Sequence, residues 1–186
     1  FIEGPVFSNV LLADEINRTS PRIQSALLEC MNERQVSIDG ETKKLSLPFM
    51  VIATQNNIHS TGTFALPEPQ LDRFMLSISM GVPNPEIQTK ILALHATNEV
   101  SSADATPIIS LDEVLEFQSQ VKSVFVSENI CRYITDICEC ARRKKGLLHA
   151  VSSRAAISLM RASQAVAWLE GNEAVYPDNV KACLLY

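Results

Sequence analysis

Two adjacent carboxylates, Asp14 and Glu15, are the residues of this chain whose position indicates chemistry most directly. They end the apolar run Val-Leu-Leu-Ala at 10–13, which is typical of a strand buried in a parallel sheet, and such sheets place ligands at the carboxyl ends of their strands. There Asp14 would hold Mg²⁺, through water because Mg²⁺ dehydrates reluctantly, and Glu15 would polarise a water that attacks a γ-phosphate. The alternative is a strand followed by an acidic loop, and this run alone does not decide between the two.

Length and composition limit the kind of protein. The 186 residues are 46% hydrophobic without an apolar run near the length of a membrane span, which is enough for one α/β domain and a small appendage. The net charge of -5 argues against a nucleic-acid binder that uses its whole surface. Five cysteines occur without a Cys-x-x-Cys pair or a signal peptide, and three histidines lack metal-binding spacing. We therefore expect a soluble, cytoplasmic protein without zinc.

The sequence Cys138-Glu139-Cys140 could belong to a metal site. However, Cys131 and Cys138 are seven residues apart and share a helical face with apolar neighbours, namely Tyr133, Ile134 and Ile137. This spacing predicts thiols in a hydrophobic core rather than metal ligands.

Strands and helices alternate in the residues around the acids. A strand is expected at about 9–14 and a helix from Pro21, a proline at the first helical position, to Glu33. Within 35–47, Asp-Gly separates two alternating segments, which is the strongest short-range signal for a hairpin. A second buried strand is expected at 49–54, and it too ends in polar residues, Gln-Asn-Asn.

The following stretch predicts a third strand. A short helix with a proline near its start covers 67–74, and the alternation of Phe74, Leu76 and Ile78 predicts a strand at about 74–80. Pro83-Asn-Pro then breaks the chain, and apolar residues at helical spacing predict a helix to about Thr97. The expected result is a three-strand parallel sheet with flanking helices.

Only helices are predicted after residue 100. Residues 101–109 are small and polar, as in a linker, and Ser110 with Glu113 forms a capping box. Further helices are expected at about 127–145, from Ser152 or Ser153 to near Gly171, and from Pro177. We therefore predict an α/β core at 1–100, a linker at 101–109 and an all-α lid at 110–186, which ends within a helical pattern.

Several motifs follow one another in a specific order: Leu-Leu-Ala-Asp-Glu-Ile-Asn-Arg at 11–18, Gln-Ser-Ala-Leu-Leu-Glu-Cys-Met at 24–31, the hairpin, Ala-Thr-Gln-Asn at 53–56 and Leu-Pro-Glu-Pro-Gln-Leu-Asp-Arg-Phe at 66–74. Together they resemble a MoxR-type AAA+ ATPase over nearly the whole chain. The resemblance implies a partial P-loop NTPase sheet followed by a helical lid. It also implies an ATPase that forms a ring, usually a hexamer, for chaperone-like remodelling or maturation of client proteins, often with partners that carry a von Willebrand factor A domain.

The resemblance also implies roles for individual residues in binding and hydrolysing ATP with Mg²⁺. Asp14 and Glu15 resemble the Walker B pair, and Asn56 resembles sensor 1, which orients the attacking water. Arg73 resembles the arginine finger that reaches the neighbouring subunit's nucleotide, and Arg154 resembles sensor 2, which reaches the γ-phosphate from the lid. Metal-holding carboxylate, water-orienting amide and guanidinium groups are the parts that phosphoryl transfer requires.

Each of the last three residues also has a local interpretation. Asn56 could cap the turn after its strand, and Arg154 could be an ordinary residue of a first helical turn. Arg73 could pair with Asp72 or Glu68 on the short helix.

The 186 residues contain no Gly-x-x-x-x-Gly-Lys-[Ser/Thr] loop, whose backbone amides and lysine supply most of the affinity for phosphates. We therefore expect a fragment that begins after this loop and that is inactive by itself. Two other functions remain open: another AAA+ branch, such as a magnesium-chelatase-like or minichromosome-maintenance-like motor, and a non-enzymatic interaction module without a P-loop.

Overall fold

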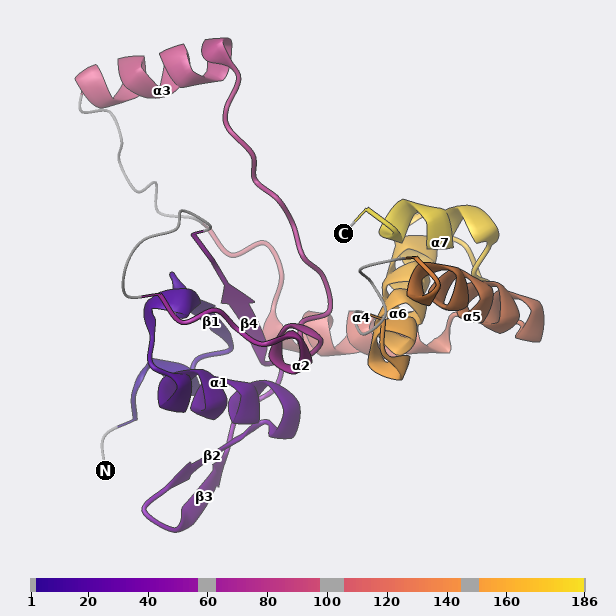
Figure 1. Ribbon diagram of the computed structural model, residues 1–186, viewed down its shortest axis with the longest axis horizontal. Helices are drawn as coiled ribbons and strands as arrows, with labels where there is room; N and C mark the ends of the chain where they lie inside the picture. Colours follow the sequence, from indigo (N-terminus) through magenta and orange to yellow (C-terminus); the bar gives the residue numbers. More distant parts are fainter. Residues whose placement is uncertain (1–2, 57–62, 98–105, 145–150, 186) are drawn as a thin grey trace.

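The computed structural model describes residues 3–56, 63–97, 106–144 and 151–185. Figure 1 shows the helices α5, α6 and α7 grouped together, apart from the strands β1 and β4 and the helix α1, while α3 extends away from both groups. In the described ranges, every element from Ser110 onward is a helix. The structure is thus an α/β part followed by a helical part.

The parallel pair β1 and β4 is the centre of the α/β part. β1 (Val10–Ala13) follows the 3-10 helix η1 (Pro5–Phe7), and it pairs with β4 (Met50–Ala53) in a register that sets Ala13 opposite Ala53. The two strands therefore end at the same level. Asp14 and Thr54, the next residue on each strand, consequently lie side by side at the carboxyl edge.

The helix and hairpin between these strands agree with their sequence signals. After the 3-10 helix η2 (Ile16–Arg18), α1 (Pro21–Glu33) begins with its proline, and β2 (Gln35–Ile38) pairs antiparallel with β3 (Glu41–Lys44). Asp39 and Gly40 have φ values of 51° and 85°, the two positive values that a type I′ hairpin turn requires. The predicted hairpin and its Asp-Gly turn are confirmed.

The predicted third strand at 74–80 is wrong. After the short helix α2 (Glu68–Leu71), the described chain makes a turn and continues as extended coil to α3 (Pro85–Ala96), without pairing to another strand. A strand exists only through its ladder of hydrogen bonds, and an alternating pattern cannot supply the neighbouring backbone. Among the residues that the structure describes, the parallel sheet therefore has two strands rather than the three predicted.

The helical part begins at α4 (Leu111–Ser123), where the predicted capping box is confirmed. The Ser110 N–H donates to Glu113 Oε2 at 2.7 Å, and the Glu113 N–H donates to Ser110 Oγ at 3.2 Å. The remaining helices are α5 (Glu128–Arg142), which ends before the expected Lys145, α6 (Ser153–Leu169) and α7 (Pro177–Cys183). Ser127 and Ser152 cap α5 and α6 through their hydroxyl groups.

The helices from α5 to α7 enclose the main hydrophobic cluster, which comprises Val124, Ile130, Ile134, Cys138, Ala167, Val175 and Val180. Burial raises the pKa of the Cys138 thiol, and the prediction of a core thiol is confirmed for this residue. Cys131 is exposed instead. The buried stripe of α5 runs along Ile130, Ile134 and Cys138, and Cys131 lies at its edge.

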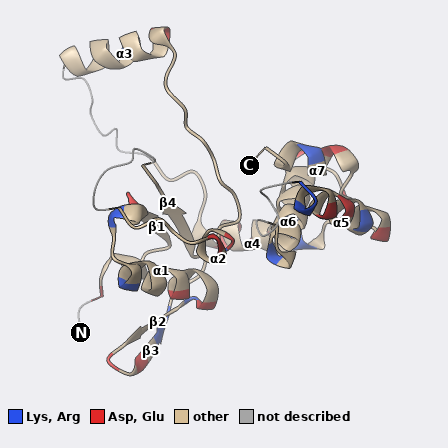
Figure 2. Ribbon diagram, in the orientation of Figure 1, with Lys and Arg blue, Asp and Glu red and all other residues tan. Residues whose placement is uncertain are grey.

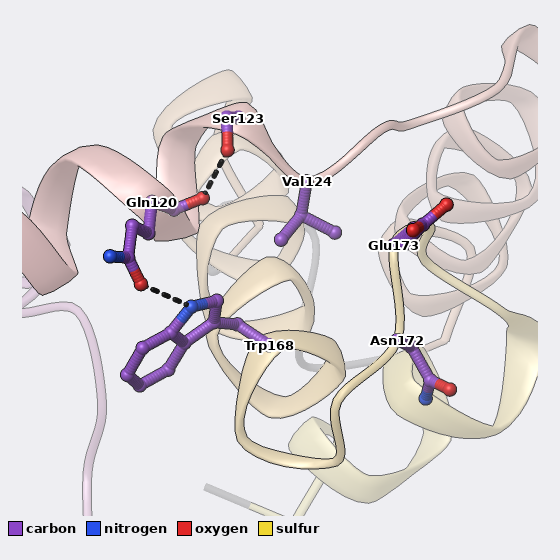
Figure 3. A pocket seen from close by; sticks show the side chains of 6 residues that line it. All are labelled: Gln120, Ser123, Val124, Trp168, Asn172 and Glu173. Carbon is purple, nitrogen blue, oxygen red and sulfur yellow. Dashed lines mark hydrogen bonds between the residues drawn. The ribbon is translucent and has the colours of Figure 1, made fainter.

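Trp168 of α6 packs against Phe117 of α4, with their ring centroids 5.2 Å apart. Figure 3 shows the Trp168 Nε1–H donating to Gln120 Oε1. This bond is 3.1 Å long, and both residues line a pocket of about 300 Å³. Trp168 therefore joins the first helix of the helical part, α4, to its third, α6.

Candidate functional site

The hydroxyl group of Thr54 joins the two strand ends. Its Oγ1 donates to Asp14 Oδ1 at 2.5 Å and accepts the backbone N–H of Glu15 at 2.8 Å. A hydroxyl carries one hydrogen and two lone pairs, so both bonds can form at once. Thr54 thereby fixes the Asp14 carboxylate and the backbone of the next acid.

Glu15 lies in a strained backbone conformation, with φ 47° and ψ 51°. A residue with a Cβ atom costs on the order of 1–3 kcal/mol in this left-handed region, and such residues cluster at functional sites. The bond from Thr54 and the bond from the Ile16 N–H to the Thr54 carbonyl, at 3.0 Å, hold the turn. These two bonds therefore hold Glu15 in the left-handed conformation immediately after β1.

Both carboxylate oxygens of Glu15 have partners. Arg18 Nε lies 2.8 Å from Oε2, and the Asn56 amide donates to Oε1 at 3.4 Å. The side chain remains 35% exposed. The geometry thus brings Asp14, Glu15 and Asn56 together at one edge of the sheet, with the amide facing the oxygen that would hold a water.

Two buried amide side chains, Asn17 and Gln24, form hydrogen bonds to the backbone around this edge. Asn17 donates to the Asn56 carbonyl at 3.0 Å. Gln24, which is 2% exposed, donates to the carbonyls of Ile16 and Phe64 at 3.2 and 3.0 Å. The Asn17 bond joins the turn after β1 to the chain after β4, and the Gln24 bonds join α1 to that turn and to Phe64.

Sequence reasoning assigned no role to Thr54, Arg18 or Gln24. The level strand ends make Thr54 the counterpart of Asp14, but strand register is not visible in a sequence. Arg18 is three residues after Glu15 in the quoted motif, and this spacing was the available signal for the ion pair. Gln24 carries no signal beyond its place on the inner face of α1.

Arg73 and Arg154 both lie near the carboxyl end of α2, and not beside Asp14 and Glu15. Arg73 is exposed directly after this helix, and within the described residues it forms no ion pair with Asp72 or Glu68. Arg154, in the first turn of α6, has its Nη1 atom 4.0 Å from Asp72 Oδ2. In the described part of the chain, neither guanidinium contacts Asp14 or Glu15.

The side chains at this edge suit a Mg²⁺ ion that takes some of its ligands from the protein and the others from a bound nucleotide and water. Asp14 is exposed, one of its oxygens is held by Thr54, and the described residues contain no group of three His, Cys, Asp or Glu side chains that could enclose an ion. Mg²⁺ binds through one or two carboxylates and keeps water and phosphate oxygens as its other ligands. The residues present fit that mode of binding.

None of the helices that the structure describes combines the length and apolarity required to cross a membrane.

Two family models match the chain. Residues 1–76 match the ATPase family associated with various cellular activities (AAA), and residues 141–186 match the AAA lid domain. The first match contains the carboxyl edge described above. The second begins near the end of α5 and contains α6 and α7.

Individual relatives match over almost all of the chain. The chain is 37% identical over 186 residues to chaperone MoxR1 of Mycobacterium tuberculosis, covering 95% of this chain and 48% of MoxR1. It is 30% identical over 205 residues to protein MoxR of Paracoccus denitrificans, covering 97% and 60%, and 40% identical over 178 residues to the uncharacterized protein YeaC of Bacillus subtilis, covering 96% and 55%. The chain spans about half the length of these curated relatives.

A solved structure has the same arrangement of elements. The crystal structure of a candidate ATPase from Cytophaga hutchinsonii, at 2.00 Å resolution, is 37% identical and superimposes with a TM-score of 0.83, covering 97% of this chain and 57% of that one. Together with the family matches and the parallel strand pair followed by a helical lid, these relatives show that the chain belongs to the MoxR-type AAA+ ATPases.

Proposed function

We propose that this chain forms the metal-binding and water-activating edge of an ATP hydrolase that remodels or matures client proteins. The observation that carries the proposal is the meeting of Asp14, Glu15 and Asn56 at level strand ends, held by Thr54. In this assignment Asp14 binds Mg²⁺ through water, and Glu15 accepts a proton from the attacking water while Asn56 orients it. Bound Mg²⁺ would neutralise the charge that develops on the phosphate oxygens.

The two arginines have separate roles in the proposal. Arg73, exposed after α2, acts on the nucleotide of the adjacent subunit, which requires a ring, and we propose a hexamer. Arg154 reaches the γ-phosphate from the lid. Guanidinium groups suit these roles because their fork of N–H donors matches phosphate oxygens.

The proposal includes partners and a location. A client protein and a partner with a von Willebrand factor A domain are the expected binding proteins. All five cysteines are free thiols, which supports a reducing, cytoplasmic environment. The name of the MoxR1 relative supports a chaperone function.

Substitution of Glu15 tests the hydrolytic assignment in the polypeptide that the complete gene encodes. Glu15→Gln keeps the shape of the side chain but removes the base, so turnover should fall by about 10²- to 10⁴-fold while MgATP binding stays within a few fold. Glu33→Gln, at an exposed position at the end of α1, is the matched control and should behave as wild type. Unchanged turnover in Glu15→Gln would refute the role of Glu15, and wild-type protein without any turnover would favour the non-enzymatic alternative.

The 186 residues by themselves should bind MgATP negligibly in isothermal titration, because they contain no phosphate-binding loop. Sub-millimolar binding would show that this edge alone supplies the affinity.

A further inference from the structure

Ser152 has two functions in the structure. Its Oγ accepts the N–H groups of Arg154 and Ala155, at 3.0 and 3.1 Å, and so caps α6. The same hydroxyl donates its hydrogen to Asp72 Oδ1, at 2.6 Å, across 80 residues of sequence. The cap of the lid helix is therefore also its attachment to the α/β part.

Asp72 directs both of its oxygens at the beginning of α6. Oδ1 accepts from Ser152, and Oδ2 lies 4.0 Å from Arg154 Nη1. The Asp72 side chain is 22% exposed, whereas Arg154 is 50% exposed. The carboxylate is thus partly enclosed at the contact, while the guanidinium remains accessible to another anion.

The backbone of Asp72 is also fixed. Its N–H bonds to the carbonyls of Gln70 and Glu68 at the end of α2, and the next residue in the chain is Arg73. Asp72 therefore contacts the residue proposed to bind the γ-phosphate, and it directly precedes in sequence the residue proposed to act on the neighbouring subunit.

We propose that Asp72 is a positioning residue that couples Arg154 to Arg73. It holds the first turn of α6 against α2 through Ser152, and it competes with nucleotide phosphate for the Arg154 guanidinium. This inference rests on the proposed function, because it assigns Arg154 to the γ-phosphate.

The Asp72–Arg154 ion pair should be replaced by a phosphate more readily than the Asp72–Ser152 hydrogen bond. An ion pair at 4.0 Å to a half-exposed arginine is weak, and phosphate binds a guanidinium by two parallel N–H bonds. Arg154 can therefore move to phosphate while the Ser152 bond keeps the helix end in place. The coupling needs only a side-chain movement.

Three substitutions separate the parts of this arrangement. Asp72→Asn keeps a carbonyl oxygen for Ser152 but removes the charge that faces Arg154. Asp72→Ala removes both. Glu68→Gln removes the same charge from an exposed position on the same helix and is the matched control.

Hydrogen exchange on the 186-residue chain tests the attachment without nucleotide. Asp72→Ala should speed exchange of the Arg154 and Ala155 amides by about three- to tenfold, the loss of roughly one hydrogen bond. Asp72→Asn and Glu68→Gln should remain near wild type, and circular dichroism verifies that each variant is folded. If Asp72→Ala exchanges like Glu68→Gln, the attachment through Asp72 is refuted.

Steady-state kinetics of the complete gene product test the competition. Asp72→Asn should lower the KM for MgATP by about two- to fivefold, the range of an exposed ion pair, and this change should disappear when Arg154 is replaced by alanine. An effect of equal size in both backgrounds would mean a merely structural role and would overturn the coupling. A product without turnover would overturn the proposed function and the competition with it, whereas the exchange data would still decide the Asp72 attachment.

Discussion

At the scale of single residues, the candidate site depends on a hydroxyl group as much as on its acids. Thr54 is the only side chain described here that bonds both to Asp14 and to the backbone of Glu15. It fixes a carboxylate at one position and a strained backbone at the next. The two acids can therefore differ in direction although they are neighbours in sequence.

Two substitutions of Thr54 should distinguish the contribution of its hydroxyl group to stability from the contribution of its branched shape. Thr54→Val preserves the branched shape but leaves the Glu15 N–H without its acceptor, so the chain should lose about 1–3 kcal/mol of unfolding free energy. Thr54→Ser keeps the hydroxyl and should lose much less. Urea unfolding of both variants measures the difference, and equal midpoints would show that the hydroxyl contributes little.

The sequence indicated the acids and the amide that meet at this candidate site, but not the full set of contacts there. Asp14 and Asn56 were recognisable because each comes shortly after an apolar run, and the structure brings both runs to one edge. Thr54 was not recognisable as a site residue, since a threonine at a strand end is common and its partner depends on register. The contact of Arg154 with Asp72 was equally hidden because it joins residues that no local pattern relates.

At the scale of elements, sequence signals predicted correctly those features that depend only on residues close in sequence. The turn at Asp39 and Gly40 and the cap at Ser110 depend on a few neighbouring residues. The strand at 74–80 depended on a partner strand, and its prediction failed. Sequence therefore predicted the helices and the hairpin better than it predicted the width of the sheet.

The contribution of the Ser110 cap to the stability of α4 can be measured by substitution. Ser110→Ala should lower the unfolding free energy by about 1 kcal/mol, whereas Ser119→Ala, at an exposed position within the same helix, should be neutral or slightly stabilising because alanine favours helices. Chemical denaturation measures both. A result in which the two variants are equal would contradict the cap.

The same cap should respond to acid. The hydrogen bonds from the Ser110 backbone N–H and then from its hydroxyl lower the pKa of Glu113. A carboxyl whose pKa is lowered on folding contributes stability above its unfolded pKa, about 4.3, and loses it as pH falls through the folded value. An NMR titration should show the pKa of Glu113 rise in Ser110→Ala, and no change would mean that the hydroxyl does not take part.

At the scale of the whole molecule, much apolar surface is uncovered. One face of the strand pair presents Val10, Leu12, Met50 and Ile52 at exposures between 46% and 63%. Figure 2 shows few charged residues on α3, and this helix exposes Ile87, Ile91, Leu92 and Leu94. Contiguous apolar surface of this kind favours association.

The 186-residue chain should therefore associate with itself in solution. Ile52→Thr keeps a β-branched residue on the strand but makes the sheet face less apolar, so it should weaken association. Ile108→Thr makes the same change at a position that is 93% exposed and outside the sheet, and it should have less effect. Light scattering across a concentration series measures both. A monomeric wild-type chain at all concentrations would refute the prediction.

The proposed ring, with nucleotide sites at its subunit boundaries, can be tested by combining two different variants. If Arg73 acts on the neighbouring nucleotide, Arg73→Ala in the complete gene product should leave binding and assembly largely intact but lower turnover by roughly 10³-fold or more. Glu15→Gln should also bind nucleotide without turning it over. The two defects would lie on opposite sides of one boundary.

Mixing these two inactive variants should restore part of the activity. In mixed rings, some boundaries combine the intact Glu15 of an Arg73→Ala subunit with the intact Arg73 of a Glu15→Gln subunit, so those sites are complete. Arg73 is suited to this role because it is exposed and, within the described residues, forms no ion pair with its neighbours Asp72 and Glu68. Native mass spectrometry establishes whether mixed rings form, and phosphate release measures their turnover. If mixed rings form and turnover stays at the level of either variant alone, Arg73 does not act across the boundary, and its effect on hydrolysis must arise within its own subunit.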